Sequence, residues 1–151
     1  MSKSAKRFDG ETCEQVAALP WRVDKDGKLR ILLVTSRTNG KWMLPKGWLM
    51  EGLAAHEAAE IEAREEAGVA GTVSSSPIGS FHFLKLFDDG ASLPAQATVF
   101  PLRVTSELKT WDEKKERDRR WMRPKEASRL AFEPDLKRFL LDLRDEALPL
   151  F

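Results

Sequence analysis

An Ala- and Glu-rich stretch from Ala54 to Ala67, followed at once by Gly68, constrains the fold of this chain more than any other feature. Alanine and glutamate are strong helix formers, and glycine is the residue that most often follows the end of a helix. The stretch therefore predicts a helix. Ala54 stands where a capping Ser, Thr or Asp is expected, and Glu57 in the first turn compensates only in part.

Strand-like segments flank this helix in the sequence. Before it, EQVAALPWRV and LRILLVTSR are joined by DKDG, and Asp-Gly is typical of a tight reversal, so we predict a hairpin. A turn at 38–40 then leads to the short apolar piece WML and to PKGW, a Pro/Gly loop. After the helix, VAGTVSS, IGSFHFLKLF and ATVFPLRVTS are rich in β-branched and aromatic residues. We expect them to be strands of one sheet.

The C-terminal third begins with a charged stretch, KTWDEKKERDRRWMRP, and continues with two helical segments near KEASRLA and PDLKRFLLDLRDEA. In the second segment Leu136, Phe139, Leu140 and Leu143 recur at helical spacing. Such a stripe predicts a helix face that packs on the core.

Length and charge limit the classes of function. The 151 residues suit one domain, which we place at 13–151 after a flexible tail at 1–12. A net charge of +1 gives no global field to attract nucleic acid or an anionic membrane. The single Cys13 cannot form an internal disulfide, and no apolar run reaches the ~18 residues of a membrane span. We expect a cytoplasmic protein with a small-molecule partner, and neither nucleic acid nor membrane as a partner.

Three acids on the predicted helix carry the chemistry. Glu62, Glu65 and Glu66 stand at i, i+3 and i+4, which places their carboxylates on one helix face. Such a face can simply be solvated. Here, however, an Ala-rich helix can pack closely on a sheet and hold the acids at its edge. Clustered carboxylate oxygens suit Mg²⁺ or Mn²⁺.

The segment from Gly47 to Val69, GWLMEGLAAHEAAEIEAREEAGV, resembles the Nudix box. The residues that match the box in register are Gly47, Glu62, Glu65, Glu66, Gly68 and Val69. Leu53 stands where the box has Glu and Ile61 where it has Arg, as if an apolar contact had replaced an ionic one. The resemblance implies an α+β protein with the Nudix-type α/β/α sandwich around a mixed sheet. It also implies a pyrophosphohydrolase that acts on diphosphates linked to another moiety.

The resemblance also implies roles for the acids. In the family, residues at the positions of Glu62, Glu65 and Glu66 bind divalent metal, and we add the Gly47 carbonyl as a further candidate ligand. We take Glu65 as the first candidate for the base and Glu66 as a second catalytic residue. Family members often add a Glu from a late loop. The candidates here are Glu113, which we favour, and Glu116, the alternative being that this charged stretch is a mobile loop.

Segments outside the box, among them WRV, LLVTSR, WMLPKG and RRWMRPKEA, resemble the diphosphoinositol polyphosphate phosphohydrolase branch over most of residues 14–140. In that branch, residues at the positions of Arg22, Ser36, Arg37 and Lys46 surround a polyphosphate. Guanidinium and ammonium groups make the charge-assisted contacts that such a ligand needs. Each basic residue taken alone could equally be a solvated surface side chain.

The function that these residues predict is Mg²⁺-dependent hydrolysis of a diphosphate linkage. Nucleoside diphosphate-type, dinucleoside polyphosphate and diphosphoinositol polyphosphate substrates all present the same reacting group, and the box does not choose among them. Because Leu53 and Ile61 depart from the box, the alternative is a catalytically weak domain that binds a nucleotide or polyphosphate as a sensor. A nucleic-acid-binding module has little support.

Overall fold

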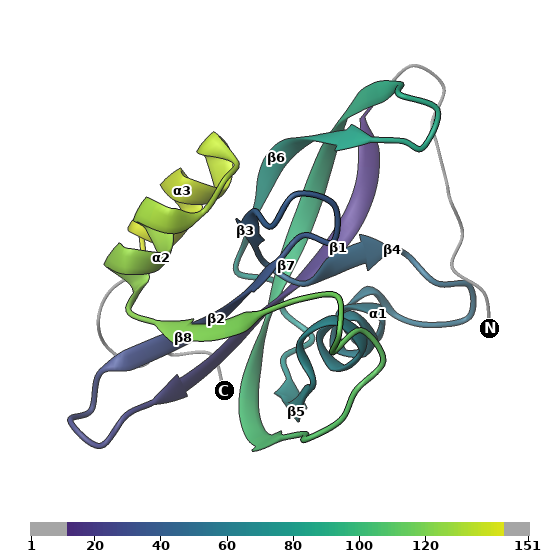
Figure 1. Ribbon diagram of the computed structural model, residues 1–151. Coiled ribbons are helices and arrows are strands. Elements are labelled where there is room, and N and C mark those ends of the chain that lie inside the picture. Colours follow the sequence, from purple (N-terminus) through teal and green to yellow (C-terminus); the bar gives the residue numbers. More distant parts are fainter. Residues whose placement is uncertain (1–11, 144–151) are drawn as a thin grey trace.

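A sheet lies between two helical layers in the computed structural model, which describes residues 12–143 (Figure 1). The first helix and the turn that continues it cover one face of the sheet, and the last two helices cover the other. Residues 1–11 of the predicted tail and residues 144–151 of the predicted domain lie outside the described residues.

The sheet is mixed, which confirms the predicted α+β sandwich. The elements are β1 (Cys13–Val23), β2 (Leu29–Thr35), β3 (Trp42–Met43), β4 (Lys46–Trp48), α1 (Ala55–Glu62), the π-helical turn η1 (Ala63–Ala67), β5 (Val69–Val73), β6 (Gly79–Leu86), β7 (Ser92–Glu107), β8 (Arg119–Met122), α2 (Pro124–Leu130) and α3 (Pro134–Leu141). The strand order is β3-β2-β1-β7-β5, while β4 also pairs with β1, β6 with β7 and β8 with β2. β1 and β7 run parallel, and the other pairs are antiparallel.

The predicted hairpin is present between β1 and β2. The carboxylate Oδ1 of Asp24 accepts the backbone N–H groups of Asp26 and Lys28 at 2.9 and 3.0 Å, and Gly27 adopts a positive φ of 77°. Only a residue without a side chain adopts that conformation readily, so the DKDG sequence specifies the reversal.

Three predictions about strands were wrong. The PKGW segment is not only a loop, because residues 46–48 form β4 against β1. The charged stretch contains β8, and β7 begins at Ser92, ahead of the predicted ATVFPLRVTS. In each case the segment adds backbone hydrogen bonds to a strand that is distant in sequence, and the side-chain pattern of the segment does not record them.

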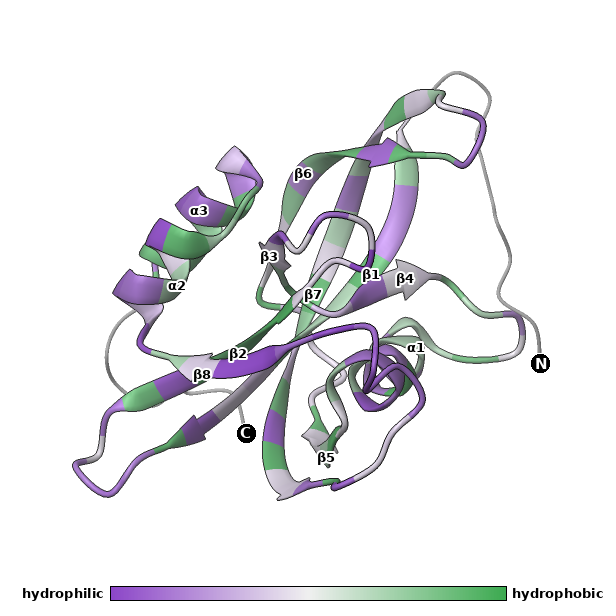
Figure 2. Ribbon diagram, viewed as in Figure 1, coloured by the Kyte–Doolittle hydropathy of each residue, from purple (hydrophilic) through white to green (hydrophobic). Residues whose placement is uncertain are grey.

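Two hydrophobic clusters lie on the two faces of the sheet. Alternate residues of β1 divide between them: Ala17 and Leu19 pack toward α2 and α3, and Val16 and Ala18 pack toward α1. The apolar stripe of the last helix is confirmed, since Leu136, Phe139 and Leu140 are buried and Leu143 packs against them. Figure 2 shows hydrophobic segments concentrated in the central strands. No helix between residues 12 and 143 is long and apolar enough to span a membrane.

Candidate active site

The acid-bearing helix is present as predicted, but it changes character before its end. After α1 the backbone continues as η1 and stops at Gly68, whose φ of 66° is left-handed. At the other end the N–H of Ala54 donates to Oε1 of Glu57 at 2.8 Å, so Glu57 caps a helix that lacks a capping side chain at Ala54. π-helical turns are rare and frequently occur at functional sites.

Two side chains fix the end of η1. Trp111 donates its indole N–H to the carbonyl of Glu66 at 3.2 Å. The Arg119 guanidinium donates to the carbonyls of Ala67 and Gly68, both at 2.9 Å, and lies 4.0 Å from the Trp111 ring centroid. A cation here satisfies carbonyls that a helix end leaves without partners and opposes the negative end of the helix dipole. The acids of η1 are therefore held on a rigid support.

Glu62 and Glu66 form a buried pair of acids. Glu62 is fully buried and Glu66 is 5% exposed. Burial, together with a hydrogen bond to Glu62 and the charge of that group, raises the pKa of Glu66 well above its usual range, although Arg117 and Lys46 oppose the shift. Two adjacent carboxyls in an apolar surrounding favour sharing a proton or a cation.

Glu65 is the third of the predicted acids. Its side chain is only partly buried, and its backbone carbonyl accepts the N–H of Glu113 at 3.0 Å. Among residues 12–143, no three His, Cys, Asp or Glu side chains are grouped closely enough to form a preassembled metal site. The predicted set of three acidic ligands is thus represented by one close pair, and the role of Glu65 as ligand or base stays a prediction.

Gly47 lies directly against the acid pair. A Cβ atom built on Gly47 would overlap the Glu62 carboxylate, so only glycine allows the carboxylate this close to the β4 backbone. Mg²⁺ in proteins is usually bound by one or two carboxylates and completes its shell with water and substrate phosphate. The pair Glu62 and Glu66, beside a glycine backbone, fits such an ion.

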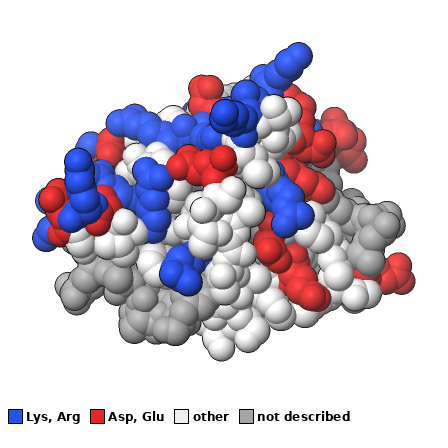
Figure 3. Space-filling view, turned by 90° about the horizontal axis from the view of Figure 1, so that it is seen from below, with Lys and Arg blue, Asp and Glu red and all other residues white. Residues whose placement is uncertain are grey.

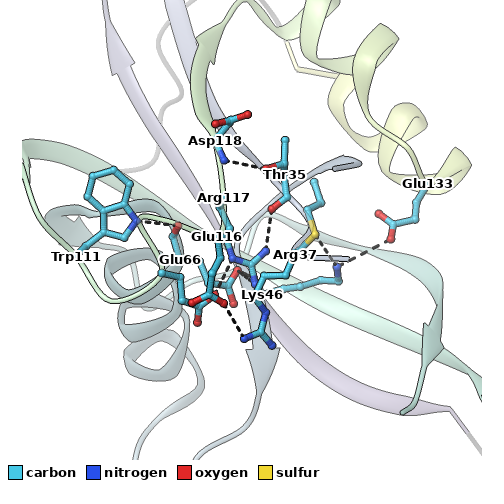
Figure 4. Close-up of polar contacts among 11 residues, drawn as sticks. Thr35, Arg37, Lys46, Glu66, Trp111, Glu116, Arg117, Asp118 and Glu133 are labelled. Carbon is cyan, nitrogen blue, oxygen red and sulfur yellow. Dashed lines mark hydrogen bonds and ion pairs between the residues drawn. The ribbon is translucent and has the colours of Figure 1, made fainter. Parts of the chain in front are cut away.

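A buried arginine connects the pair to the late loop, residues 108–118 between β7 and β8. The Arg117 side chain is 7% exposed. It donates from Nε to Oε1 of Glu113 at 2.7 Å and from NH1 to the carbonyl of Thr35 at 2.9 Å, and its NH2 lies 4.0 Å from Oε1 of Glu66 (Figure 4). The sequence analysis did not single out Arg117 within the charged stretch. Its spacing of four residues from Glu113 was the available signal.

The late loop therefore packs on the site instead of extending into solvent as a mobile charged loop. Thr35 anchors it twice: its N–H donates to the Asp118 carbonyl at 3.1 Å, and its hydroxyl accepts the Asp118 N–H at 2.8 Å. Of the two predicted late acids, Glu113 lies beside the acid pair. Glu116 pairs at the surface with Arg37, at 3.4 Å.

Lys46 is the predicted basic residue that the structure brings to the acids. Its backbone N–H donates to Oε1 of Glu66 at 3.2 Å. Its ammonium lies 3.9 Å from Oε2 of Glu133 and 4.6 Å from the Phe83 ring centroid, and burial lowers its pKa despite the charges of Glu133 and Glu66. Glu133 was missed because nothing in its local sequence marks it.

The other residues predicted to bind the substrate do not lie together. Arg22 pairs with Glu107 at 2.8 Å and stacks on the Trp121 ring. It lies five residues along β1 from Ala17, the partner of Lys46, which is about 16 Å on an extended strand. The structure therefore does not place Arg22 at the acid pair.

Ser36 and Arg37 belong to the turn after β2. The Ser36 hydroxyl donates to Oδ1 of Asn39 at 2.6 Å and accepts the N–H of Lys41 at 3.0 Å. Ser36 therefore shapes the turn, and Arg37 lies at its exposed rim. Figure 3 shows basic and acidic side chains mixed over the face seen from below, so an anionic ligand depends on local cations.

The profile of the NUDIX domain matches residues 14–143. The chain belongs to the NUDIX family. Nudix hydrolase 12, mitochondrial, of Arabidopsis thaliana is 36% identical over 131 residues, which are 82% of this chain and 64% of that protein. Nudix hydrolase 13, mitochondrial, of the same organism is 34% identical over 116 residues, 72% of this chain and 56% of that protein. The chain thus spans less than two thirds of the length of these two relatives.

Solved NUDIX structures share the fold. The NUDIX domain of Shewanella oneidensis NrtR complexed with ADP ribose superposes with a TM-score of 0.65 at 14% identity, covering 89% of this chain and 86% of that one. A binary complex of C. elegans Ap4A hydrolase gives 0.64 at 19% identity, covering 86% and 93%. At these identities the likeness supports the fold alone.

The two departures from the NUDIX box have an apolar explanation. Leu53 and Ile61 are both partly buried, and both pack against the hydrophobic cluster that includes Ala58, Ala59 and Ala63 of the acid-bearing helix. Both side chains thus make apolar contacts at positions where the box carries a Glu and an Arg. Neither change removes an oxygen of the buried acid pair.

We predict that Gly47→Ala weakens Mg²⁺ binding by at least about tenfold, the scale on which a group that orients a ligand affects a metal site. The added methyl group requires the Glu62 carboxylate or the β4 backbone to move. Calorimetric titration with Mg²⁺ measures the change, and circular dichroism checks that the variant is folded. A folded variant with unchanged affinity would show that Glu62 does not take part in binding.

The raised pKa of Glu66 predicts a pH-dependent stability of the metal-free NUDIX domain. The folded state holds this proton more tightly than the unfolded chain, whose carboxyl keeps the usual value of 4.5. The contribution of Glu66 to the free energy of unfolding is therefore greatest below pH 4.5 and falls as the pH rises toward the folded-state pKa. We expect Tm, measured by calorimetry, to fall less steeply above pH 4.5 in Glu66→Gln. Parallel curves would contradict this.

Proposed function

We propose that this NUDIX domain is a Mg²⁺-dependent hydrolase of a diphosphate linkage in a small phosphorylated substrate. One observation carries the proposal: the buried pair Glu62 and Glu66 lies against Gly47, with Lys46 and Arg117 beside it. Oxygen donors for a hard cation thus lie within 4.0 Å of one guanidinium, that of Arg117, and next to the strand that carries Lys46, whose backbone N–H donates to Glu66. Charged side chains on an exposed surface are seldom fixed by contacts of this kind.

The residues have separate roles in the proposed reaction. Glu62 and Glu66, with Glu65 as third ligand, would hold Mg²⁺, which when bound neutralises diphosphate charge and acidifies a water. Water attacks one phosphorus, the bridging P–O bond breaks, and the departing phosphate takes the bonding electron pair. Glu65, which is only partly buried, is assigned as the base that accepts the proton of the water.

Positive charge at the site suits a transition state rich in phosphate oxygens. The Lys46 side chain, 10% exposed, contacts Glu133 and the Phe83 ring, and Arg117 is held by Glu113 and Thr35. Preorganised cations of this kind stabilise developing charge without having to reorient. Glu113 in this account positions Arg117.

The second candidate is a domain that binds its phosphorylated ligand without turnover. It is motivated by Leu53 and Ile61, which remove a Glu and an Arg from the box. Their packing on the apolar cluster supports the enzyme instead, because the acid pair is kept.

The test is Mg²⁺-dependent phosphate release, or release of a phosphorylated product, from three substrate classes. These are nucleoside diphosphate derivatives, dinucleoside polyphosphates and diphosphoinositol polyphosphates. We expect turnover of at least one class and none after chelation with EDTA. A folded protein that binds Mg²⁺ and the ligand tightly, yet forms no product over long incubation, would establish the binding domain instead.

A further inference from the structure

The last turn of the acid-bearing helix has its backbone carbonyls satisfied from outside the helix. The final four carbonyls of a helix have no N–H partner within it. Here they belong to residues 65–68, because the N–H of Gly68 already donates to the carbonyl of Arg64. The late loop and the first residue of β8 supply donors to all four: Glu113 N–H to Glu65 (3.0 Å), Trp111 Nε1–H to Glu66 (3.2 Å), the Arg119 guanidinium to Ala67 and Gly68 (both 2.9 Å), and Leu108 N–H to Gly68 (2.8 Å). The late loop thus caps the helix that carries the acids.

Packing on its ring holds Trp111 in place as a donor. A Cβ atom built on Gly68 would overlap the ring, so the indole lies directly against the backbone at the helix end. The Arg119 guanidinium lies 4.0 Å from the ring centroid and also donates to the carbonyl of Leu108 at 3.1 Å, where the loop begins. A side chain locked by packing and by its neighbours' hydrogen bonds can hold another group within narrow limits. The indole N–H is therefore kept at the carbonyl of Glu66.

Glu66 is held at both ends. Its backbone carbonyl accepts the indole N–H of Trp111 (Figure 4). Its carboxylate Oε1 accepts the backbone N–H of Lys46 at 3.2 Å and lies 4.0 Å from NH2 of Arg117. Glu62 belongs to α1, whereas Glu66 belongs to η1. The conformation of η1 therefore decides where the second acid of the pair lies relative to the first.

Trp111 acts on the site only through Glu66. An indole has one N–H group and no acceptor. In Trp111 that group donates to the Glu66 carbonyl, so it is not available to a metal ion, a water or a substrate oxygen. Any effect of Trp111 on the site must pass through the position of Glu66.

We propose that Trp111 is a positioning residue for the divalent metal site, because it fixes the backbone from which the Glu66 carboxylate reaches Glu62. Groups that orient metal ligands without touching the ion typically change metal affinity by roughly 10- to 100-fold. The inference rests on the proposed function, because the ion is the one that the proposed reaction requires. It extends that function by making the late loop part of the metal site.

The experiment measures Mn²⁺ binding to the metal-free protein by electron paramagnetic resonance, in which the signal of the free ion decreases on binding. Mn²⁺ takes the same oxygen ligands as Mg²⁺. Trp111→Phe keeps an aromatic ring against Gly68 and Arg119 and removes the N–H donor. We expect the Kd for Mn²⁺ to rise about tenfold in this variant.

Trp121→Phe is the matched control. The Trp121 indole N–H also donates over 3.2 Å, but to Oε1 of Glu107 in β7. Each variant loses one hydrogen bond, so the Tm of both should fall by a similar amount, about 2–4 °C. The Kd for Mn²⁺ should stay within about twofold in Trp121→Phe, because its acceptor is not in η1. A difference in Kd at equal Tm separates positioning of the acid from general stability.

Arg119→Lys is a second, independent variant. It keeps the positive charge, but an ammonium lacks the planar fork with which the guanidinium reaches Ala67, Gly68 and Leu108 together. We expect it to raise the Kd for Mn²⁺ at least about threefold. If Trp111→Phe does not fold, an unchanged Kd in Arg119→Lys overturns the inference.

Each contrary result has a distinct meaning. Equal Mn²⁺ affinity in the wild type and Trp111→Phe, or equal losses in Trp111→Phe and Trp121→Phe, would overturn the positioning role and leave the proposed function intact. Mn²⁺ binding that depends on Trp111, in a wild type that hydrolyses no diphosphate, would remove the proposed function and leave the positioning role. A wild type that binds no Mn²⁺ would contradict both.

Discussion

Replacing Glu66 with Gln is expected to reduce Mg²⁺-dependent product release by about 100-fold or more while the protein stays folded. The substitution keeps the size of the side chain but removes one of the two buried carboxyl groups that fit the cation. Loss of an essential charged group at such a site costs two to four orders of magnitude in rate. Initial rates at saturating Mg²⁺ measure the effect, so that weaker binding alone does not explain it.

A matched control lies on the same helix. Glu60→Gln makes the same change in α1, but Glu60 is only partly buried and does not belong to the acid pair. We expect it to retain turnover within about twofold. If Glu66→Gln and Glu60→Gln have the same small effect, the acid pair is not the catalytic centre.

Arg117→Met is expected to lower the free energy of unfolding by about 3 kcal/mol, the cost of removing one partner from a buried ion pair. The substitution leaves the carboxylate of Glu113 without its nearest cation and the Thr35 carbonyl without its donor. It also removes a positive charge that favours the ionised form of Glu66. Urea denaturation of the metal-free protein measures the loss.

Two further variants separate burial from charge. Arg64→Met removes an exposed arginine of η1 and should change stability by less than about 0.5 kcal/mol. In a Glu113→Gln background, Arg117→Met should cost less than it does in the wild type, because the two residues are coupled. Equal costs in both backgrounds would show that the pairing with Glu113 does not account for the stability.

Local sequence patterns were sufficient to predict the elements that are determined by their own residues. The Ala/Glu run before Gly68 predicted the acid-bearing helix, DKDG predicted the hairpin, and the spacing of Leu136, Phe139 and Leu140 predicted the buried face of the last helix. The spacing of the box residues then predicted the family, which the comparison confirmed.

Long-range contacts account for what the sequence did not predict. The pattern of Ala and Glu did not predict the π-helical turn, whose end is fixed by Trp111 and by Arg119 of β8, both distant in sequence. Glu133 reaches Lys46 only through the packing of α3. Local spacing holds no information about such partners.

The place of Arg22 in the fold could not be predicted from its position in the sequence. Its place in the sequence suggested a polyphosphate contact, yet in the structure its guanidinium is taken by Glu107 and Trp121 at the far end of β1. A basic residue is available to a ligand only where the fold leaves its charge near the site.

Anomalous diffraction from crystals soaked with Mn²⁺ and a non-hydrolysable diphosphate analogue tests the central claim most directly. The account predicts an anomalous peak within coordination distance of the Glu62 and Glu66 carboxylates, adjoining the Gly47 backbone and the analogue's phosphates. A peak bound elsewhere, or none in a preparation that hydrolyses diphosphates, would contradict it.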